Sequence, residues 1–384
     1  MHISGFRTFL AGVAVAALAW TGVAAAAPVS DAVRPISDEE LADGWIALYD
    51  GHSLYGWERL GVSEWTVEDG VIRVDSGAGG MLATSVGFKN AQVIMELGLG
   101  RDTRAGVAMR ASLEGHPSEN GSAPFTFAAG DEDRTVTLSF TKQGNSVSVS
   151  EYVDGDWQEV DSVSSADMND RGRVALYYYG GGTLEVRSVK LRPLGMESIF
   201  NGEDLTGWKN PWPERDSEFS VIDGALNIKD GNGQIETEAV YRDFLLQMEI
   251  YSNGEHLNSG VFFRGPPEVF WRGYESQIRN QWVGDDRTRA VDYGTGGIYG
   301  RQPARKVTSS DFEWFYKTIV VDDHQMAVWL NGYMVANLLD VMPPVDNYDG
   351  KAGFVTEAGT IHLQGHDPAT DLSFREMYIQ SYDE

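Results

Sequence analysis

The sequence predicts an all-β protein of two tandem sandwiches or jelly rolls. Apolar and polar residues alternate in residues 135–141, 146–150, 184–191 and 245–250, which is typical of half-buried strands. Asp-Gly at 69–70 and 223–224 and Asn-Gly at 331–332 are dipeptides typical of tight hairpins. The only helix we expect is a short one near Ser37, where Ser-Asp-Glu-Glu is a capping signal.

An internal repeat sets the domain organisation. LYDGHSLYGW (48–57) matches IFNGEDLTGW (199–208), and residues 106–110 match residues 260–264 at an offset of 154. The offset is 178 between residues 172–176 and 350–354, and 188 between residues 186–187 and 374–375. The second copy has therefore gained segments in its middle and near its end.

We place the boundary between the two copies near residues 193–196. This gives modules of residues 36–194 and 195–384. Each is long enough to bury a core of its own, since single domains commonly have about 100–200 residues.

Composition excludes several classes of partner and chemistry. The 30 Lys+Arg against 57 Asp+Glu give a net charge of −27, which argues against nucleic acid or an anionic membrane as the main ligand. The absence of cysteine excludes disulfides, thiolate nucleophiles and cysteine-ligated metals. We therefore expect a small-molecule partner, and nothing in the sequence specifies the oligomeric state.

The first 27 residues are typical of a secretory signal peptide. Arg7 precedes an apolar run over residues 9–23, and small residues lead to a cleavage site near Ala26 or Ala27. No later stretch is long and apolar enough to span a bilayer. We expect a periplasmic or secreted protein that uses no NAD, ATP or coenzyme A.

The second module contains six motifs in order: FNGEDLTGW (200–208), NSGVFFR (258–264), GYESQI (273–278), TGGIYG (295–300), WLNG (329–332) and LQGH (363–366). In these motifs it resembles the 3-keto-disaccharide hydrolase domain family, and the resemblance implies a concanavalin-like or laminin-G-like jelly roll. The family often has Trp-Asn where this chain has Trp314-Phe315. The first module resembles a degenerate copy, since it keeps the opening motif and Arg110 but has no counterpart of Gly-Tyr-Glu-x-Gln or Leu-Gln-x-His.

Three residues are the candidates for catalysis. Strand alternation places Glu275 and Gln277 on one face, where the Glu275 carboxylate could act as a general acid or base, or could be an ordinary surface group. Arg264 could clamp a substrate oxygen, or could pair structurally with Glu249 or Glu275. His366 could transfer a proton, or could be a hydrogen-bonded loop residue.

Further polar and aromatic residues are candidates for substrate binding. The neutral side chains suited to sugar hydroxyls are Asn258, Gln277, Tyr299 and Gln364. Trp271, in a predicted loop, could stack on a sugar ring, although such aromatics are more often in the core. His362 and His366 are four residues apart but should diverge on a strand, so we assign no metal.

The resemblance implies a function as well as a fold. A 3-ketone acidifies the neighbouring C2–H, so a base could form an enolate that expels the C1 substituent, after which water could add back. The alternative is a non-catalytic pair of carbohydrate-binding modules. A retaining glycosidase with two carboxylates is disfavoured because the Glu-x-Asp-x-x-Glu strand of jelly-roll glycosidases is missing.

Overall fold

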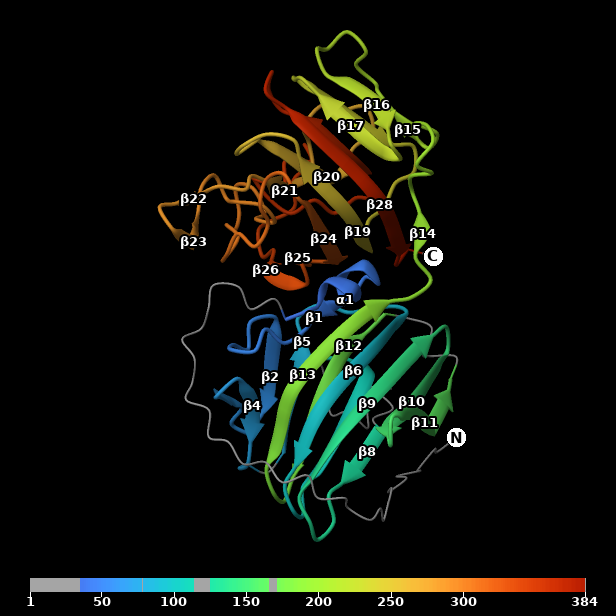
Figure 1. The fold of residues 1–384 in the computed structure, drawn as a ribbon, viewed down its shortest axis with the longest axis vertical. Helices are drawn as coiled ribbons and strands as arrows, with labels where there is room; N and C mark the ends of the chain where they lie inside the picture. The colour runs from blue at the N-terminus through green and yellow to red at the C-terminus, as the bar shows by residue number, and fades with distance from the viewer. Residues whose placement is uncertain (1–34, 78, 114–124, 166–170, 384) are drawn as a thin grey trace.

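The computed structural model describes residues 35–77, 79–113, 125–165 and 171–383. The predicted signal peptide lies outside these residues. Two β-sandwiches follow each other along the chain, and Figure 1 shows the second above the first. The all-β prediction is confirmed, since the described residues contain a single helix, α1 (Asp38–Ala42).

The first sandwich packs an eight-stranded sheet against a five-stranded sheet. The eight-stranded sheet has the order β11-β10-β9-β6-β13-β4-β3, with β1 paired to β13, and the five-stranded sheet has the order β2-β5-β12-β7-β8. The strands are β1 (Ile46–Ala47), β2 (Trp57–Gly61), β3 (Thr66–Glu68), β4 (Val71–Val74), β5 (Gly80–Thr84), β6 (Ala91–Leu99), β7 (Arg104–Ala111), β8 (Phe125–Ala128), β9 (Arg134–Gln143), β10 (Ser146–Val153), β11 (Asp156–Ser164), β12 (Arg173–Gly180) and β13 (Leu184–Pro193).

The second sandwich repeats this plan and adds a hairpin. Its eight-stranded sheet has the order β16-β17-β28-β19-β24-β25-β26, with β14 paired to β28, and its five-stranded sheet has the order β15-β18-β27-β20-β21. The strands are β14 (Glu197–Ser198), β15 (Trp208–Lys209), β16 (Glu218–Ile222), β17 (Ala225–Lys229), β18 (Gly233–Thr237), β19 (Phe244–Ser252), β20 (Ser259–Gly265), β21 (Tyr274–Ile278), β22 (Trp282–Val283), β23 (Asp286–Ala290), β24 (Trp314–Asp322), β25 (Gln325–Leu330), β26 (Tyr333–Leu339), β27 (Thr360–Gly365) and β28 (Asp371–Ser381). Strands β22 and β23 form the hairpin.

The repeated opening motif makes the same contacts in both copies. Trp57 Nε1 donates to Leu48 O at 2.7 Å, and Trp208 Nε1 donates to Ile199 O at 2.6 Å. Before each tryptophan a short polar side chain caps the turn: Asp50 accepts two backbone N–H bonds, and Asn201 does the same. The motif is thus a local folding unit, which explains why both modules keep it.

The local sequence signals also have their expected structures. Each residue of the Asp-Gly and Asn-Gly turns has a positive φ, as a type I′ hairpin requires. Helix α1 begins with a complete capping box between Ser37 and Glu40.

The two sandwiches share a junction that buries apolar side chains of both. The outer face of the eight-stranded sheet of the second sandwich lies against α1 and β1 of the first (Figure 1). Trp329 on β25 is fully buried in the core cluster of the first sandwich, and its Nε1 donates to Ala47 O at 2.8 Å. Arg171 of the first module pairs with Asp243 at 3.0 Å and Asp322 at 2.5 Å in the second.

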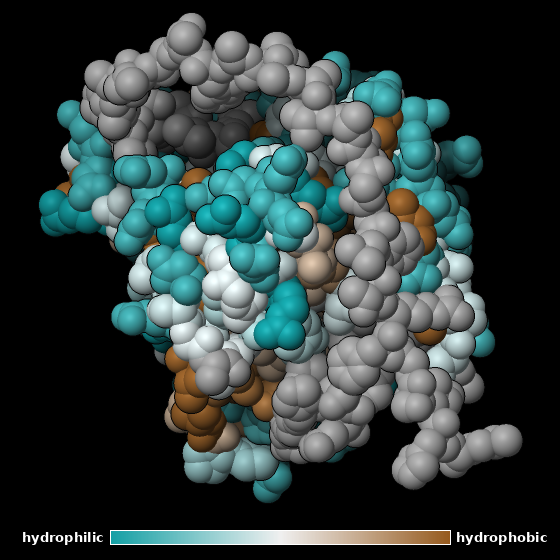
Figure 2. Space-filling model, turned by 90° about the horizontal axis from the view of Figure 1, so that it is seen from below, coloured by the Kyte–Doolittle hydropathy of each residue, from teal (hydrophilic) through white to brown (hydrophobic). Residues whose placement is uncertain are grey.

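The end of the molecule formed by the first sandwich has a mostly polar surface. Viewed from below the orientation of Figure 1, hydrophilic residues cover much of the coloured surface, with smaller hydrophobic areas between them (Figure 2). The junction, rather than this end, is where the first module buries apolar side chains of its neighbour.

We expect Trp329→Ala to lower the free energy of unfolding by about 3–5 kcal/mol, because it removes a large side chain from the junction and leaves Ala47 O without its donor. Chemical denaturation of the full chain measures the effect, with Val341→Ala, at a position 80% exposed, as the control. Equal unfolding midpoints for the two variants would show that the junction contributes little.

Candidate functional site

Eight positions on the outer side of the five-stranded sheet form what we call the polar face. Strand pairing aligns them in two rows, because directly opposed residues of antiparallel strands point the same way. One row contains Glu236, His362, Phe262 and Glu275, and the other contains Gln234, Gln364, Gly260 and Gln277. The intervening residues, among them Ile235, Val261 and Leu363, point into the core of the sandwich.

Glu275 is the carboxylate of this face whose environment is most unusual. It is 5% exposed, and its side chain lies over the bare backbone of Gly260. A Cβ at Gly260 would lie 2.7 Å from both Cγ and Oε1 of Glu275. The glycine in the NSGVFFR motif therefore makes room for the carboxylate.

Burial gives Glu275 a titration range suited to proton transfer. Desolvation raises the pKa of its carboxyl from 4.5 to about 7, with Asp292 raising it further and Lys351 and Lys317 holding it lower. Lys351 Nζ lies 4.0 Å from Glu275 Oε2 and 4.4 Å from the centre of the Tyr299 ring. A carboxyl with a pKa near neutrality can both accept and donate a proton under ordinary conditions.

Hydrogen bonds link His366 to the same face. Asn258 Nδ2 lies 3.2 Å from His366 Nε2 and 3.4 Å from Asp292 Oδ2, and Gln277 Nε2 donates to Asp292 Oδ2 at 3.2 Å. His366 Nδ1 donates to Asp367 Oδ2 at 3.0 Å, which leaves Nε2 as the basic nitrogen of the neutral ring. The structure thus brings four of the predicted site residues together: Glu275, Gln277, Asn258 and His366.

Trp271 stacks on His366 from the loop after β20. The two rings are 5.7 Å apart and 7° from parallel. Trp271 has a φ of 49°, and its backbone N–H donates to Gln234 Oε1 at 2.9 Å, while Glu268 N–H donates to Glu236 Oε1 at 3.0 Å. Buried side chains of the polar face therefore hold this loop, and with it the indole, in place.

The His362 end of the face is structural. His362 and Glu236 are fully buried, and His362 Nδ1 accepts from Gln234 Nε2 at 2.6 Å while Nε2 contacts Thr360 Oγ1. Burial lowers the pKa of His362 to about 3, so the ring is neutral. As expected, His362 and His366 diverge into different environments.

Three buried polar atoms at the His366 end lack a hydrogen-bond partner among the described residues. They are Asn258 Oδ1, Trp271 Nε1 and Gln364 Oε1. An unpaired buried donor or acceptor is costly, so such atoms point to a ligand that can both donate and accept hydrogen bonds. All three belong to residues that the sequence predicted for substrate binding.

The structure does not bring Arg264 to the polar face. A bulge between Phe262 and Gly265 and a φ of 54° turn its side chain away, and it is fully buried. Its guanidinium donates to Asp243 Oδ1 at 2.6 Å and to three backbone carbonyls. Its partner is neither Glu249 nor Glu275, and every one of these bonds belongs to the framework rather than to an open site.

Sequence reasoning missed four charged residues around the site. Asp292 and Lys351 lie on loops far along the chain from Glu275, and Lys317 lies on the opposite sheet, so no local motif links them to it. Asp367 follows His366 directly, and that adjacency was a usable signal. Tyr299 lies beside Glu275, since its backbone N–H donates to Glu275 O at 2.9 Å.

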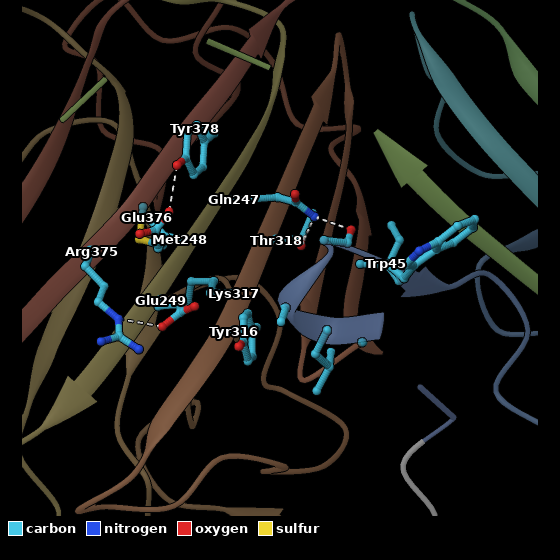
Figure 3. A pocket seen from close by; sticks show the side chains of 15 residues that line it. Trp45, Gln247, Met248, Glu249, Tyr316, Lys317, Thr318, Arg375, Glu376 and Tyr378 are labelled. Carbon is cyan, nitrogen blue, oxygen red and sulfur yellow. Dashed lines mark hydrogen bonds and ion pairs between the residues drawn. The ribbon is translucent and has the colours of Figure 1, made fainter. Parts of the chain in front are cut away.

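Two hollows lie away from this face. One, of about 400 Å³, is at the module junction between α1 and the outer face of β19, β24 and β28, with the Glu249–Arg375 pair on its wall (Figure 3). The other, of about 730 Å³, is in the first sandwich beside Arg73 and Glu185. The candidate site is thus defined by its buried and unpartnered polar groups, not by either of these hollows.

No group of three or more potential ligands among the described residues could hold a metal ion. The adjacent carboxylates Asp322 and Asp323 form ion pairs with Arg171 and Arg242. In the same part of the chain, no helix has the length and apolar character needed to cross a membrane.

These observations define a tandem jelly-roll protein with a buried acid–base group on one sheet face. The chain belongs to the family of 3-keto-alpha-glucoside-1,2-lyase-like domains, whose model matches residues 44–164 and 195–380. The match covers most of both sandwiches, including the one that lacks the Gly-Tyr-Glu-x-Gln motif, although β12 and β13 of the first lie outside it.

The chain is similar to parts of several known proteins. A 3-keto-disaccharide hydrolase of Bacteroides thetaiotaomicron is 32% identical over 78 residues, covering 17% of this chain and 27% of that protein, so the match spans about a quarter of the relative's length. A Parabacteroides distasonis structure named "putative glycosyl hydrolase" is 21% identical, covering 49% of this chain and 94% of its own (TM-score 0.39). Carbohydrate-binding module CBM66 from Bacillus subtilis is 13% identical, covering 47% and 99% (TM-score 0.35).

We expect Glu275→Gln to stabilise the protein at pH 8 but not near pH 4.5. Because the folded-state pKa is raised from 4.5 to about 7, the wild type loses stability relative to the variant as pH rises through this window. The shift corresponds to a difference on the order of 3 kcal/mol. Denaturation at several pH values measures it, with exposed Glu203→Gln as the control, and a pH-independent difference would contradict it.

Gly260→Ala tests the packing of the carboxylate. The added methyl should cost about 1–3 kcal/mol of stability, as overpacking commonly does, and much less when Glu275 is also changed to alanine. A double-mutant cycle measures the coupling. Gly254→Ala is the control, because its Cβ would meet only the flexible tip of Leu257, and additive effects at 260 and 275 would show that the two positions do not interact.

Proposed function

We propose that the second sandwich cleaves 3-keto-glycosides, including 3-keto-disaccharides, by proton abstraction at C2 and elimination of the C1 substituent. The observation that carries the proposal is the buried Glu275 carboxyl, with a pKa of about 7, on the same face as His366. Membership of a family named for a lyase on 3-keto-glucosides supports this choice of substrate.

The chemistry needs a base, a cation near the developing enolate and an acid. Glu275 takes the C2 proton, and the C–H electrons form the C2=C3 enolate, whose collapse to the ketone makes a C1=C2 double bond and breaks the C1–O bond. In this assignment His366 enters the step protonated on both ring nitrogens and gives its Nε2 proton to the departing oxygen. Addition of water across C1=C2 would complete net hydrolysis. The opposite assignment, with His366 as base and Glu275 as acid, uses the same two groups.

The cation in this mechanism is Lys351 rather than Arg264. Lys351 Nζ lies 4.0 Å from Glu275 Oε2 and is partly exposed, whereas the donors of Arg264 are committed to buried partners. A positive charge beside the base can stabilise an enolate oxygen that forms next to it.

The three buried polar atoms that lack a partner provide groups for binding the substrate. Sugar hydroxyls both donate and accept, so they could satisfy Asn258 Oδ1, Trp271 Nε1 and Gln364 Oε1 together. Trp271 would border the sugar, and Tyr299 lies on the Glu275 side of the site. We further propose that the protein is exported through its N-terminal signal peptide and acts in the periplasm or outside the cell.

We expect Glu275→Gln and His366→Ala each to lower kcat/KM for 3-keto-trehalose or a 3-keto-glucoside by about 100-fold or more, since a positioned acid or base contributes about 10²–10⁴-fold. Turnover in D₂O should place deuterium at C2 of any rehydrated product, because water protonates that carbon. Glu203→Gln and His324→Ala, both outside the polar face, are the matched controls.

Two outcomes would overturn the proposal. Full activity in the combined Glu275→Gln and His366→Ala variant would show that neither residue is needed for catalysis. Binding of unoxidised sugars with no turnover of any keto-sugar would instead make the chain a carbohydrate-binding protein, and hydrolysis of ordinary glycosides without C2 exchange would indicate direct displacement.

A further inference from the structure

A buried lysine lies beneath the strand that carries Glu275. Lys317 on β24 is 1% exposed and points from the eight-stranded sheet into the core. Its Nζ donates to Ser276 O and Ser276 Oγ at 3.1 Å and to Gln277 O at 3.0 Å. The three ammonium hydrogens are therefore used by two successive residues of β21.

A buried ammonium is costly, so its presence needs a reason beyond packing. The internal repeat supplies a comparison within the same chain. Met95 in β6 pairs with Leu138, and the corresponding Met248 in β19 pairs with Lys317. The first sandwich thus has an apolar residue where the second has the lysine.

The partner position differs in the same way. Val107 pairs with Phe125 in the first sandwich, and the corresponding Val261 pairs with Ser276 in the second. At these two positions the first module has Leu138 and Phe125. The second module, which has the Gly-Tyr-Glu-x-Gln motif, has Lys317 and Ser276. The fold itself does not require the polar pair, because the first sandwich is built without it.

The lysine anchors a strand at the edge of its sheet. β21 pairs with β20 on one side only, and on the other side it is bonded by the loop over residues 294–299, including Gly296 N–H to Gln277 O at 2.8 Å. Lys317 adds a third attachment, from below. The backbone of Ser276 and Gln277 is held on every side, which fixes the outward direction of the Glu275 and Gln277 side chains.

We infer that Lys317 is a positioning residue of the active site, which holds β21 in place and puts a positive charge on the opposite side of the strand from the Glu275 carboxylate. The inference rests on the proposed function for its catalytic consequence. Burial lowers the pKa of Lys317 to about 7, and the Glu275 carboxylate opposes that shift, so the two groups titrate in the same range.

Other groups also face Glu275 and must be held constant in a test. Lys351 and Asp292 act on it from the loops above the face, and the Tyr299 phenol lies on the same side. Lys317 is distinguished from them because it contacts the strand and not the open face. Its removal changes the charge on Glu275 without touching a bound substrate.

We expect Lys317→Met and Lys317→Gln to move the acidic limb of the kcat/KM profile for a 3-keto-glycoside to higher pH by about 1 unit, because the carboxylate loses a favourable charge. Ser276→Ala, which keeps the charge and removes one of three contacts, should lower kcat and leave the limb in place. Lys229→Met, at the surface, is the matched control. If folded Lys317 variants keep the acidic limb of the kcat/KM profile at its wild-type pH, the inference is overturned.

A second measurement does not need activity. In carbon-13 NMR titrations, Lys317→Met should raise the midpoint of the Glu275 carboxyl, and Glu275→Gln should lower the midpoint of Lys317, because coupling between two sites is reciprocal. The second titration uses a variant that we expect to be stable even if the Lys317 variants do not fold. If the titration midpoint of Lys317 is the same in Glu275→Gln as in the wild type, the coupling is refuted. If the midpoints shift but the protein does not turn over keto-glycosides, only the proposed function is refuted.

Discussion

The burial of the Glu275 carboxyl against a sheet face is the constraint on which the rest of the site depends. A carboxylate removed from water is unstable unless charge or hydrogen bonds offset the loss. Here Gly260 provides the space, Lys351 and Lys317 provide positive charge from opposite sides, and Asp292 adds negative charge. The balance leaves the pKa of the carboxyl near neutrality, so the protein gives up stability to keep a group that can exchange protons.

The same sandwich plan serves two purposes in this chain. In the first module the equivalent core positions are apolar, and its helix α1 and strand β1 cover the outer face of the neighbouring sheet. That cover buries Trp329, and Arg171 extends the junction with ion pairs to Asp243, the residue that also holds Arg264. The degenerate copy therefore covers the second sandwich on the side away from the polar face.

Much of this architecture could be predicted from the sequence because its signals are local. Two-residue alternation located the strands, positive-φ dipeptides located the turns, and the alternation around Glu275 placed it on one face with Gln277. Arg264 shows the limit of the same reasoning. Alternation assumes an unbroken strand. At Arg264 a bulge reverses the direction of the side chain, and the guanidinium donates to Asp243 instead of facing the site.

The residues that sequence reasoning missed share one property: they reach the site from other elements. Lys317 approaches from the opposite sheet, and its neighbours on β24 give an ordinary buried-strand pattern in which a lysine would be expected to face solvent. The strand pairing in the two copies shows that the lysine is unusual. When Met95 is aligned with Met248, their partners Leu138 and Lys317 occupy the same position. A repeated fold thus provides its own comparison: at this position one copy has a leucine and the other buries a lysine beside the strand of Glu275, so the shared fold alone does not account for that charge.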